Sequence, residues 1–385
     1  MIQVNVEISQ SAGSGRARSA RIIALIALVG LCGTLGPATA APALEAIEVK
    51  AGYRQILGVL ATGDLEGAVV DLVEFEQSVV GEQEDAWRYT DKFWRFKLNV
   101  IRDLLHSQPV DVLMPIILLH HDAYLEYSRL DRRHLAHHSR QMASELAEIY
   151  AQEANTQKAR EFSGWVLTSF AANVWLPTSM GGSANLFYRS YLVDPGNQVA
   201  LFGLAAAYER SGDYEKAIEY LRQALRIDPE NSEVGLRLAL CLIRSEPEPP
   251  QVAISNLTVL TGEAHPTWIR SVAYQELAKI WIQSGREDEA ESLVRKGLGE
   301  LPGDPQLSLQ LAAMLDRQRR RDEAVRTLDA IAADGRHQDS PRQRYAVWAP
   351  TGMDEVRVAL REEMKQGLSA LGAGLQVAPT EEVEE

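Results

Sequence analysis

A period of 34 residues constrains the fold of this chain more than any other feature. Ala278 and Ala312 lie 34 positions apart, and so do Ala290 and Ala324. A related stretch upstream, residues 204–231, reads LAAAYERSGDYEKAIEYLRQALRIDPEN. Repeats of this length form supersecondary units that bury their apolar faces by stacking on their neighbours. The period therefore predicts an array of stacked repeats.

Each unit reads as two antiparallel helices joined by a tight turn. In the clearest copy, Ala205 and Ala217 are the small residues at which the two helices approach each other. Gly212 falls in the turn, and Pro229 ends the second helix because proline cannot continue it. This pattern resembles the tetratricopeptide repeat (TPR), and the resemblance implies a solenoid of helical hairpins. Strong copies open at residues 198, 271 and 305, and degenerate copies open at residues 164 and 232.

The predicted fold class is all-α, because no run of alternating apolar and polar residues indicates strands. Before the solenoid, the turn at Gly63 and the small residue Ala68 indicate an isolated TPR-like hairpin. We expect a signal peptide over 1–40, an irregular helical N-terminal domain with that hairpin over 41–160, a TPR α-solenoid of five repeats (two degenerate) over 161–335, and a loop, a helix capping the last repeat and a disordered acidic tail over 336–385.

The N-terminal segment has the features of an export signal. Arg16, Arg18 and Arg21 precede the apolar run IIALIALVGLCGTLG, which is shorter than the ~20 residues of a membrane span. Ala38 and Ala40 supply the small residues that a signal peptidase requires. We expect cleavage near Ala40, a periplasmic or secreted bacterial protein, and no membrane span in the mature chain. An uncleaved signal anchor is the alternative.

Charge and cysteine content narrow the classes of function. The formal net charge of -14 opposes binding to nucleic acid, because phosphates would be repelled. Cleavage would leave Cys241 as the one cysteine, and its apolar neighbours predict a small buried hydrophobe. No catalytic motif is recognisable, so we expect neither catalytic residues nor a cofactor. Arginines at 317 and 319–321 form either a small basic patch or a solvated turn.

A histidine-rich segment, residues 120–138, suggests a metal site as the alternative function. His134 and His138 lie one helical turn apart, a spacing at which two imidazoles can bind a transition metal. Asp122 or Glu126 could supply a third ligand if the two helices form a hairpin. The competing interpretations are a solvated helical face with His138 partly buried, or a pH-responsive surface. The segment would serve a metal-binding or metal-dependent envelope protein.

The TPR resemblance implies that the first helix of each repeat lines a concave groove. Such a groove suits an extended peptide or a helix. We therefore expect an exported, non-catalytic scaffold or adaptor that binds a protein or peptide partner, or alternatively an accessory subunit of an envelope enzyme complex. The predicted groove residues are Phe202, Glu209, Leu236, Arg237, Arg244, Gln275, Lys279, Gln283, Leu309, Gln310 and Arg317.

Overall fold

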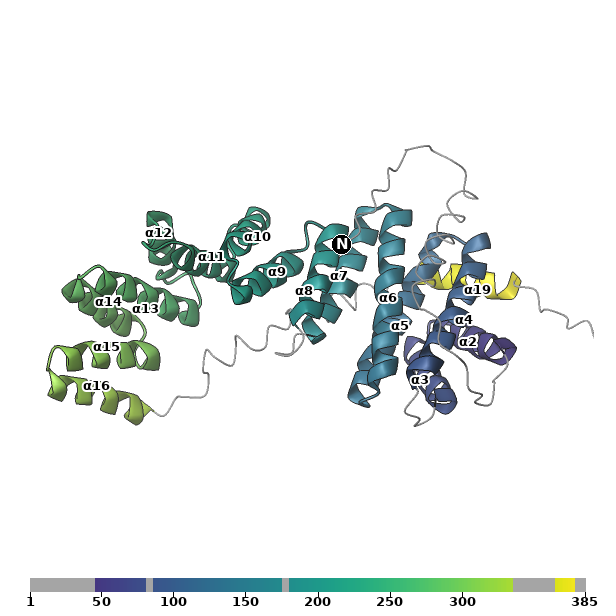
Figure 1. The fold of residues 1–385 in the computed structure, drawn as a ribbon, viewed down its shortest axis with the longest axis horizontal. Helices are drawn as coiled ribbons and strands as arrows, with labels where there is room; N and C mark the ends of the chain where they lie inside the picture. The colour runs from purple at the N-terminus through teal and green to yellow at the C-terminus, as the bar shows by residue number, and fades with distance from the viewer. Residues whose placement is uncertain (1–45, 81–85, 175–179, 335–363, 378–385) are drawn as a thin grey trace, which may run out of the picture. The chain divides into compact units, whose positions relative to one another are not determined.

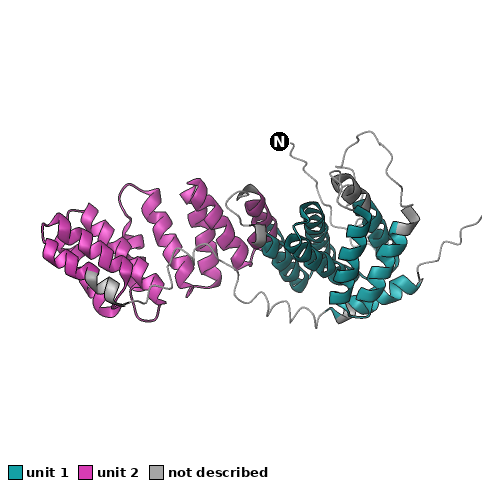
Figure 2. Cartoon of the chain, turned by 90° about the horizontal axis from the view of Figure 1, so that it is seen from below, with its two compact units in different colours: residues 1–170, 192–194, 351–385 teal, residues 171–191, 195–350 magenta. Residues whose placement is uncertain are grey.

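The computed structural model describes residues 46–80, 86–174, 180–334 and 364–377 (Figure 1). Within these ranges the chain forms helices and turns without strands, which confirms the all-α class. The predicted signal peptide, the loop up to residue 363 and the acidic tail lie outside the described residues. The chain divides into two compact units: residues 1–170, 192–194 and 351–385 form unit 1, and residues 171–191 and 195–350 form unit 2 (Figure 2).

Unit 1 is built around one helix that is apolar on nearly every side. The run LMPIILL gives α5 no polar face in its first half, and a helix of this kind must be buried. It forms a hairpin with α6 and also contacts α2 and α3. The helices of unit 1 are α2 (Ala46–Ala61), α3 (Leu65–Val80), α4 (Ala86–Ser107), the 3-10 helix η1 (Val110–Val112), α5 (Leu113–Arg129), α6 (Arg133–Ala154), most of α7 (Gln157–Val174) and α19 (Lys365–Val377).

An ion pair lies inside the core of unit 1. Lys97 Nζ is 2.6 Å from Glu76 Oε1, and both side chains are about 97–98% buried. Tyr127 donates its hydroxyl proton to Glu76 Oε2 at 2.5 Å. Because a buried charge is tolerated only when it is paired and hydrogen-bonded, these three side chains form one unit that ties α3 to α4 and α5.

Two histidines border this ion pair and are kept neutral. His120 is fully buried and its Nε2 is hydrogen-bonded to the Tyr53 hydroxyl at 2.9 Å. Burial, then the charge of Lys97, holds the pKa of His120 well below its usual value. Burial and Lys97 also lower the pKa of His138 to about 3, and its ring centroid lies 5.3 Å from that of Trp94. The core of unit 1 therefore resists protonation.

Unit 2 is a series of helical hairpins, which confirms the predicted TPR solenoid. The pairs α9–α10, α11–α12, α13–α14 and α15–α16 pack together, and each hairpin also contacts the next one along the chain. The helices are α8 (Met180–Val193, mainly in unit 2), α9 (Gln198–Ser211), α10 (Tyr214–Ile227), α11 (Ser232–Ser245), α12 (Gln251–Leu260), α13 (Thr267–Gln283), α14 (Glu287–Glu300), α15 (Pro305–Arg317) and α16 (Arg321–Asp334).

Local sequence explains where these helices begin and how closely they pack. Asn197, Asp213 and Asn231 accept a main-chain N–H through their side chains and so cap α9, α10 and α11. Ala205 and Ala217 are fully buried where α9 meets α10, as their small size predicts. In the hairpin α11–α12, the prolines of EPEPP replace the glycine turn and α12 begins after Pro250.

The C-terminal helix α19 packs against α2 and η1 of unit 1 (Figure 1). Leu371 is fully buried there. The close fit depends on Gly367, where an added Cβ would lie 2.5 Å from the carbonyl oxygen of Asp111. Most of the helix that was predicted to cap the last repeat lies outside the described residues.

None of the described helices is both long enough and apolar enough to cross a membrane.

Candidate protein-binding face and histidine segment

The first helices of the four hairpins, α9, α11, α13 and α15, carry every predicted groove residue. We call the exposed and partly exposed members of this set the first-helix face. Two predicted members do not belong to it, because Phe202 and Leu236 are buried in the core of unit 2. Arg244, Lys279, Gln283, Leu309 and Arg317 are exposed, and Glu209, Arg237, Gln275 and Gln310 are partly exposed.

A carboxylate held by two arginines connects α9 to α11. Arg237 Nη1 donates to Glu209 Oε2 at 2.9 Å, and Arg244 Nη1 donates to Glu209 Oε1. The guanidinium carbon of Arg237 lies 4.8 Å from the centre of the Phe202 ring, within cation–π range. Both arginines are therefore paired within the chain, although the Arg244 side chain remains 48% exposed.

Amide groups connect α13 to α15 farther along the same face. Gln310 Nε2 donates to the main-chain oxygen of Gln275 at 3.2 Å. The Gln310 Oε1 atom is buried and has no hydrogen-bond partner among the described residues. Leu309 is 50% exposed, and Lys279 is exposed while paired with Glu276 at 2.6 Å. This part of the face therefore exposes an apolar side chain and a cation.

Two residues near this face have structural roles. Cys241 is fully buried, and burial followed by the charge of Glu209 raises the pKa of its thiol to about 12. The thiol is therefore inert, as its apolar neighbours predicted. Arg320 pairs with Glu291 at 3.0 Å and with Glu323 at 2.7 Å. One arginine of the run at 317–321 therefore joins α14 to α16 through ion pairs.

The predicted metal ligands have different surroundings. His138 packs against Trp94, whereas His134, one helical turn earlier on α6, is exposed. The proposed third ligands have other partners: Asp122 accepts from His121 Nδ1 at 3.0 Å, and Glu126 pairs with Arg129. Among the residues that the structure describes, no three His, Cys, Asp or Glu side chains could hold a metal ion.

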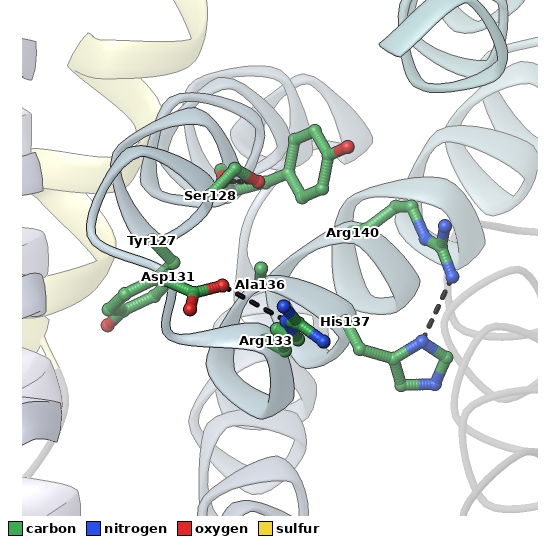
Figure 3. Close-up of a pocket in the computed structure, with 8 residues that line it drawn as sticks. Tyr127, Ser128, Asp131, Arg133, Ala136, His137 and Arg140 are labelled. Carbon is green, nitrogen blue, oxygen red and sulfur yellow. Dashed lines mark hydrogen bonds and ion pairs between the residues drawn. The ribbon is translucent and has the colours of Figure 1, made fainter. Parts of the chain in front are cut away.

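A pocket lies beside the turn that joins α5 to α6, in the same segment. Its cavity volume is about 310 Å³. Figure 3 shows side chains from the end of α5, the turn and the beginning of α6 gathered around it. The sequence analysis noted the histidines here but missed the pocket, because its lining comes from both arms of a hairpin. The lining residues are Tyr124, Tyr127, Ser128, Asp131, Arg133, Ala136, His137 and Arg140.

Comparisons with known proteins agree with the repeat pattern. The tetratricopeptide repeat family matches residues 199–231 and residues 282–346. No curated protein matches the sequence.

Similar solved structures include MamA from Desulfovibrio magneticus RS-1, which is 16% identical, with 46% of this chain and 97% of that chain covered and a TM-score of 0.37. PilF from Pseudomonas aeruginosa is 18% identical, with 56% and 92% covered and a TM-score of 0.39. YrrB, described as a TPR protein with an unusual peptide-binding site, is 19% identical, with 47% and 92% covered and a TM-score of 0.34. The two family matches fall in unit 2, so this part of the chain contains tetratricopeptide repeats.

Proposed function

We propose that this chain is an exported, non-catalytic scaffold that binds an extended segment of a protein partner along the first-helix face of unit 2. The observation that carries the proposal is the exposure of Arg244, Lys279 and Leu309 on three consecutive first helices. Repeated accessible positions at the spacing of the repeats suit a ligand that runs along the array. The partner would be recognised over several hairpins, each contributing a small part of the affinity.

The chemistry of the face favours a partner segment with an acidic side chain and an apolar side chain. The exposed Arg244 guanidinium can bind a carboxylate while Arg237 continues to neutralise Glu209. Leu309 offers an apolar contact to the ligand. An enzyme complex in which this chain is an accessory subunit would be a special case, with a catalytic subunit as the partner.

The test is a peptide selection followed by binding measurements on matched variants. Peptides selected from a displayed library against the chain from residue 41 onward would be titrated by fluorescence polarisation. The test variant combines Arg244→Ala, Lys279→Ala and Leu309→Ala, which removes exposed side chains and leaves Glu209 paired with Arg237. The control variant combines Val252→Ala and Val259→Ala, which are 57% and 66% exposed on the second helix α12.

We expect the test variant to bind selected acidic peptides at least about tenfold more weakly, since each lost contact contributes on the order of 1 kcal/mol. The control variant should bind like the unaltered chain. Equal losses in both variants, or none in the test variant, would show that the partner binds elsewhere. Thermal unfolding of both variants would establish that they are folded.

Export is a separate part of the proposal. It is supported by residues 16–40, in which basic residues are followed by an apolar run and then by small residues. Signal cleavage near Ala40 would give a mature chain that begins at Ala41. Mass spectrometry of the protein recovered from a bacterial envelope fraction would identify the first residue. Recovery of the chain with Met1 intact would contradict cleavage.

A further inference from the structure

The pocket beside the α5–α6 turn has a positive lining in a strongly acidic chain. Arg133 and Arg140 contribute two guanidinium groups, and Asp131 contributes one carboxylate. The whole chain carries a formal net charge of -14. A cationic hollow on a protein that repels anions elsewhere concentrates an anionic ligand at one place.

Arg140 has no carboxylate partner among the described residues. Its Nη2 instead donates to Nδ1 of His137 at 2.9 Å (Figure 3). Partial burial, followed by the charges of Arg140 and His134, lowers the pKa of His137. A neutral imidazole leaves the charge of Arg140 uncompensated, and an uncompensated guanidinium in a pocket favours a carboxylate or a phosphate.

The contact also fixes the position of the proton on His137. A guanidinium only donates hydrogen bonds, so Nδ1 of the neutral ring must accept and Nε2 must carry the proton. Nε2 has no partner in the part of the chain that the structure describes. The pocket thus has a second donor besides the remaining N–H groups of Arg140.

The other arginine is available as well. Arg133 pairs with Asp131 at 3.0 Å, but the two side chains are 85% and 79% exposed. An ion pair this exposed is worth little and can be exchanged for a contact with a ligand. Tyr124 and Ala136 supply apolar surface to the same lining, and the Tyr124 ring is held edge-on against Phe170 at 5.1 Å.

We propose that this pocket binds the oxyanion group of a small ligand, either a phosphate or a carboxylate, and that an apolar part of the ligand lies against Tyr124. Arg140 and the Nε2–H of His137 hold the oxyanion, and Arg133 turns toward it from its pair with Asp131. This site lies in unit 1 and is independent of the first-helix face.

Four probes test the site and distinguish the two sources of an oxyanion: inorganic phosphate, phenyl phosphate, acetate and benzoate. Binding would be followed in the full chain at low ionic strength by the NMR signal of the His137 Hε1 proton and by calorimetry. The test variant is Arg140→Gln, and Arg140→Lys keeps the charge without the planar donors. The control is Arg129→Gln, because Arg129 is paired with Glu126 and does not line the pocket.

We expect saturable binding of at least one oxyanion. Phenyl phosphate should bind about tenfold more tightly than phosphate, and benzoate more tightly than acetate, because burial of the ring removes apolar surface from water. Arg140→Gln should weaken binding at least tenfold, Arg140→Lys should weaken it less, and Arg129→Gln should leave it unchanged. Preference between phosphate and acetate identifies the natural oxyanion. The proposal is wrong if none of the four probes saturates the signal, or if a folded Arg140→Gln variant binds as well as the unaltered chain.

Discussion

Turn residues show how a single position affects one hairpin. In the hairpins of α9 and α13, the turns place Gly212 and Gly285 at φ values of 81° and 73°. The last hairpin has Arg319 in the same left-handed region, with φ 64°. A side chain with a Cβ is disfavoured there by about 1–2 kcal/mol, whereas glycine is not.

We therefore predict that Arg319→Gly stabilises the last hairpin by about 0.5–1 kcal/mol, after allowing for the greater freedom of glycine in the unfolded chain. The reverse change, Gly212→Ala, should destabilise by about 1 kcal/mol through backbone strain alone. The added Cβ would meet no atom within 4 Å. Urea unfolding midpoints measure both effects. A midpoint that falls for Arg319→Gly would contradict the strain argument.

At the scale of elements, sequence predicted hairpins better than it predicted contacts between helices. The 34-residue period and the small residues identified the helices of unit 2, because they reflect packing within one hairpin. The Glu209 cluster was missed because its arginines lie 28 and 35 positions away. Opposite charges separated by about one repeat length were the available signal. The burial of Phe202 and Leu236 was not predicted, because repeat counting does not determine how deeply a side chain is buried.

The docking of α19 on unit 1 leads to an element-scale prediction. Gly367→Ala would place a Cβ 2.5 Å from the main-chain oxygen of Asp111, and backbone cannot move away as a flexible side chain can. Overpacking of this kind costs about 1–3 kcal/mol and should weaken the docking. Hydrogen exchange of the amides in α2 and η1 should become faster, while α13 and α14 in unit 2 should be unaffected.

Gly372→Ala is the matched control on the same helix. Its Cβ would lie 3.7 Å from the Cβ of Ala61, an ordinary van der Waals contact. Protection of α2 should then be unchanged or slightly higher, because alanine also favours the helix. If Gly367→Ala left the exchange of α2 and η1 unaltered, α19 would not depend on this close approach.

At the scale of the whole molecule, His120 and His138 should make unit 1 less stable than unit 2 at acidic pH. Above pH 6.5, His120 and His138 are neutral whether the chain is folded or unfolded. Below pH 6.5, the two histidines become protonated in the unfolded chain but stay neutral in folded unit 1, because burial and the charge of Lys97 lower their pKa values. For His138, whose folded pKa is about 3, stability is lost progressively as the pH falls from about 6.5 to about 3.

His138 should cost unit 1 about 1.4 kcal/mol per pH unit below 6.5, or about 2 kcal/mol at pH 5. The lowered pKa of His120 acts in the same direction. The lowered pKa values of Glu291, Glu300 and Glu323 in unit 2 start from 4.5, so those carboxylates contribute little above pH 5.

We therefore expect unit 1 to unfold at a lower urea concentration than unit 2 at pH 5. The difference between the two urea midpoints should be smaller at pH 7.5. Hydrogen exchange at both pH values can assign each unfolding step to helices of unit 1 or unit 2. His138→Gln should reduce the dependence of unit 1 on pH, whereas His134→Gln, at an exposed position of the same helix, should not. An unchanged pH dependence in His138→Gln would mean that acid destabilises unit 1 through other groups. The neutral histidine beside the Lys97–Glu76 ion pair would then not be the cause.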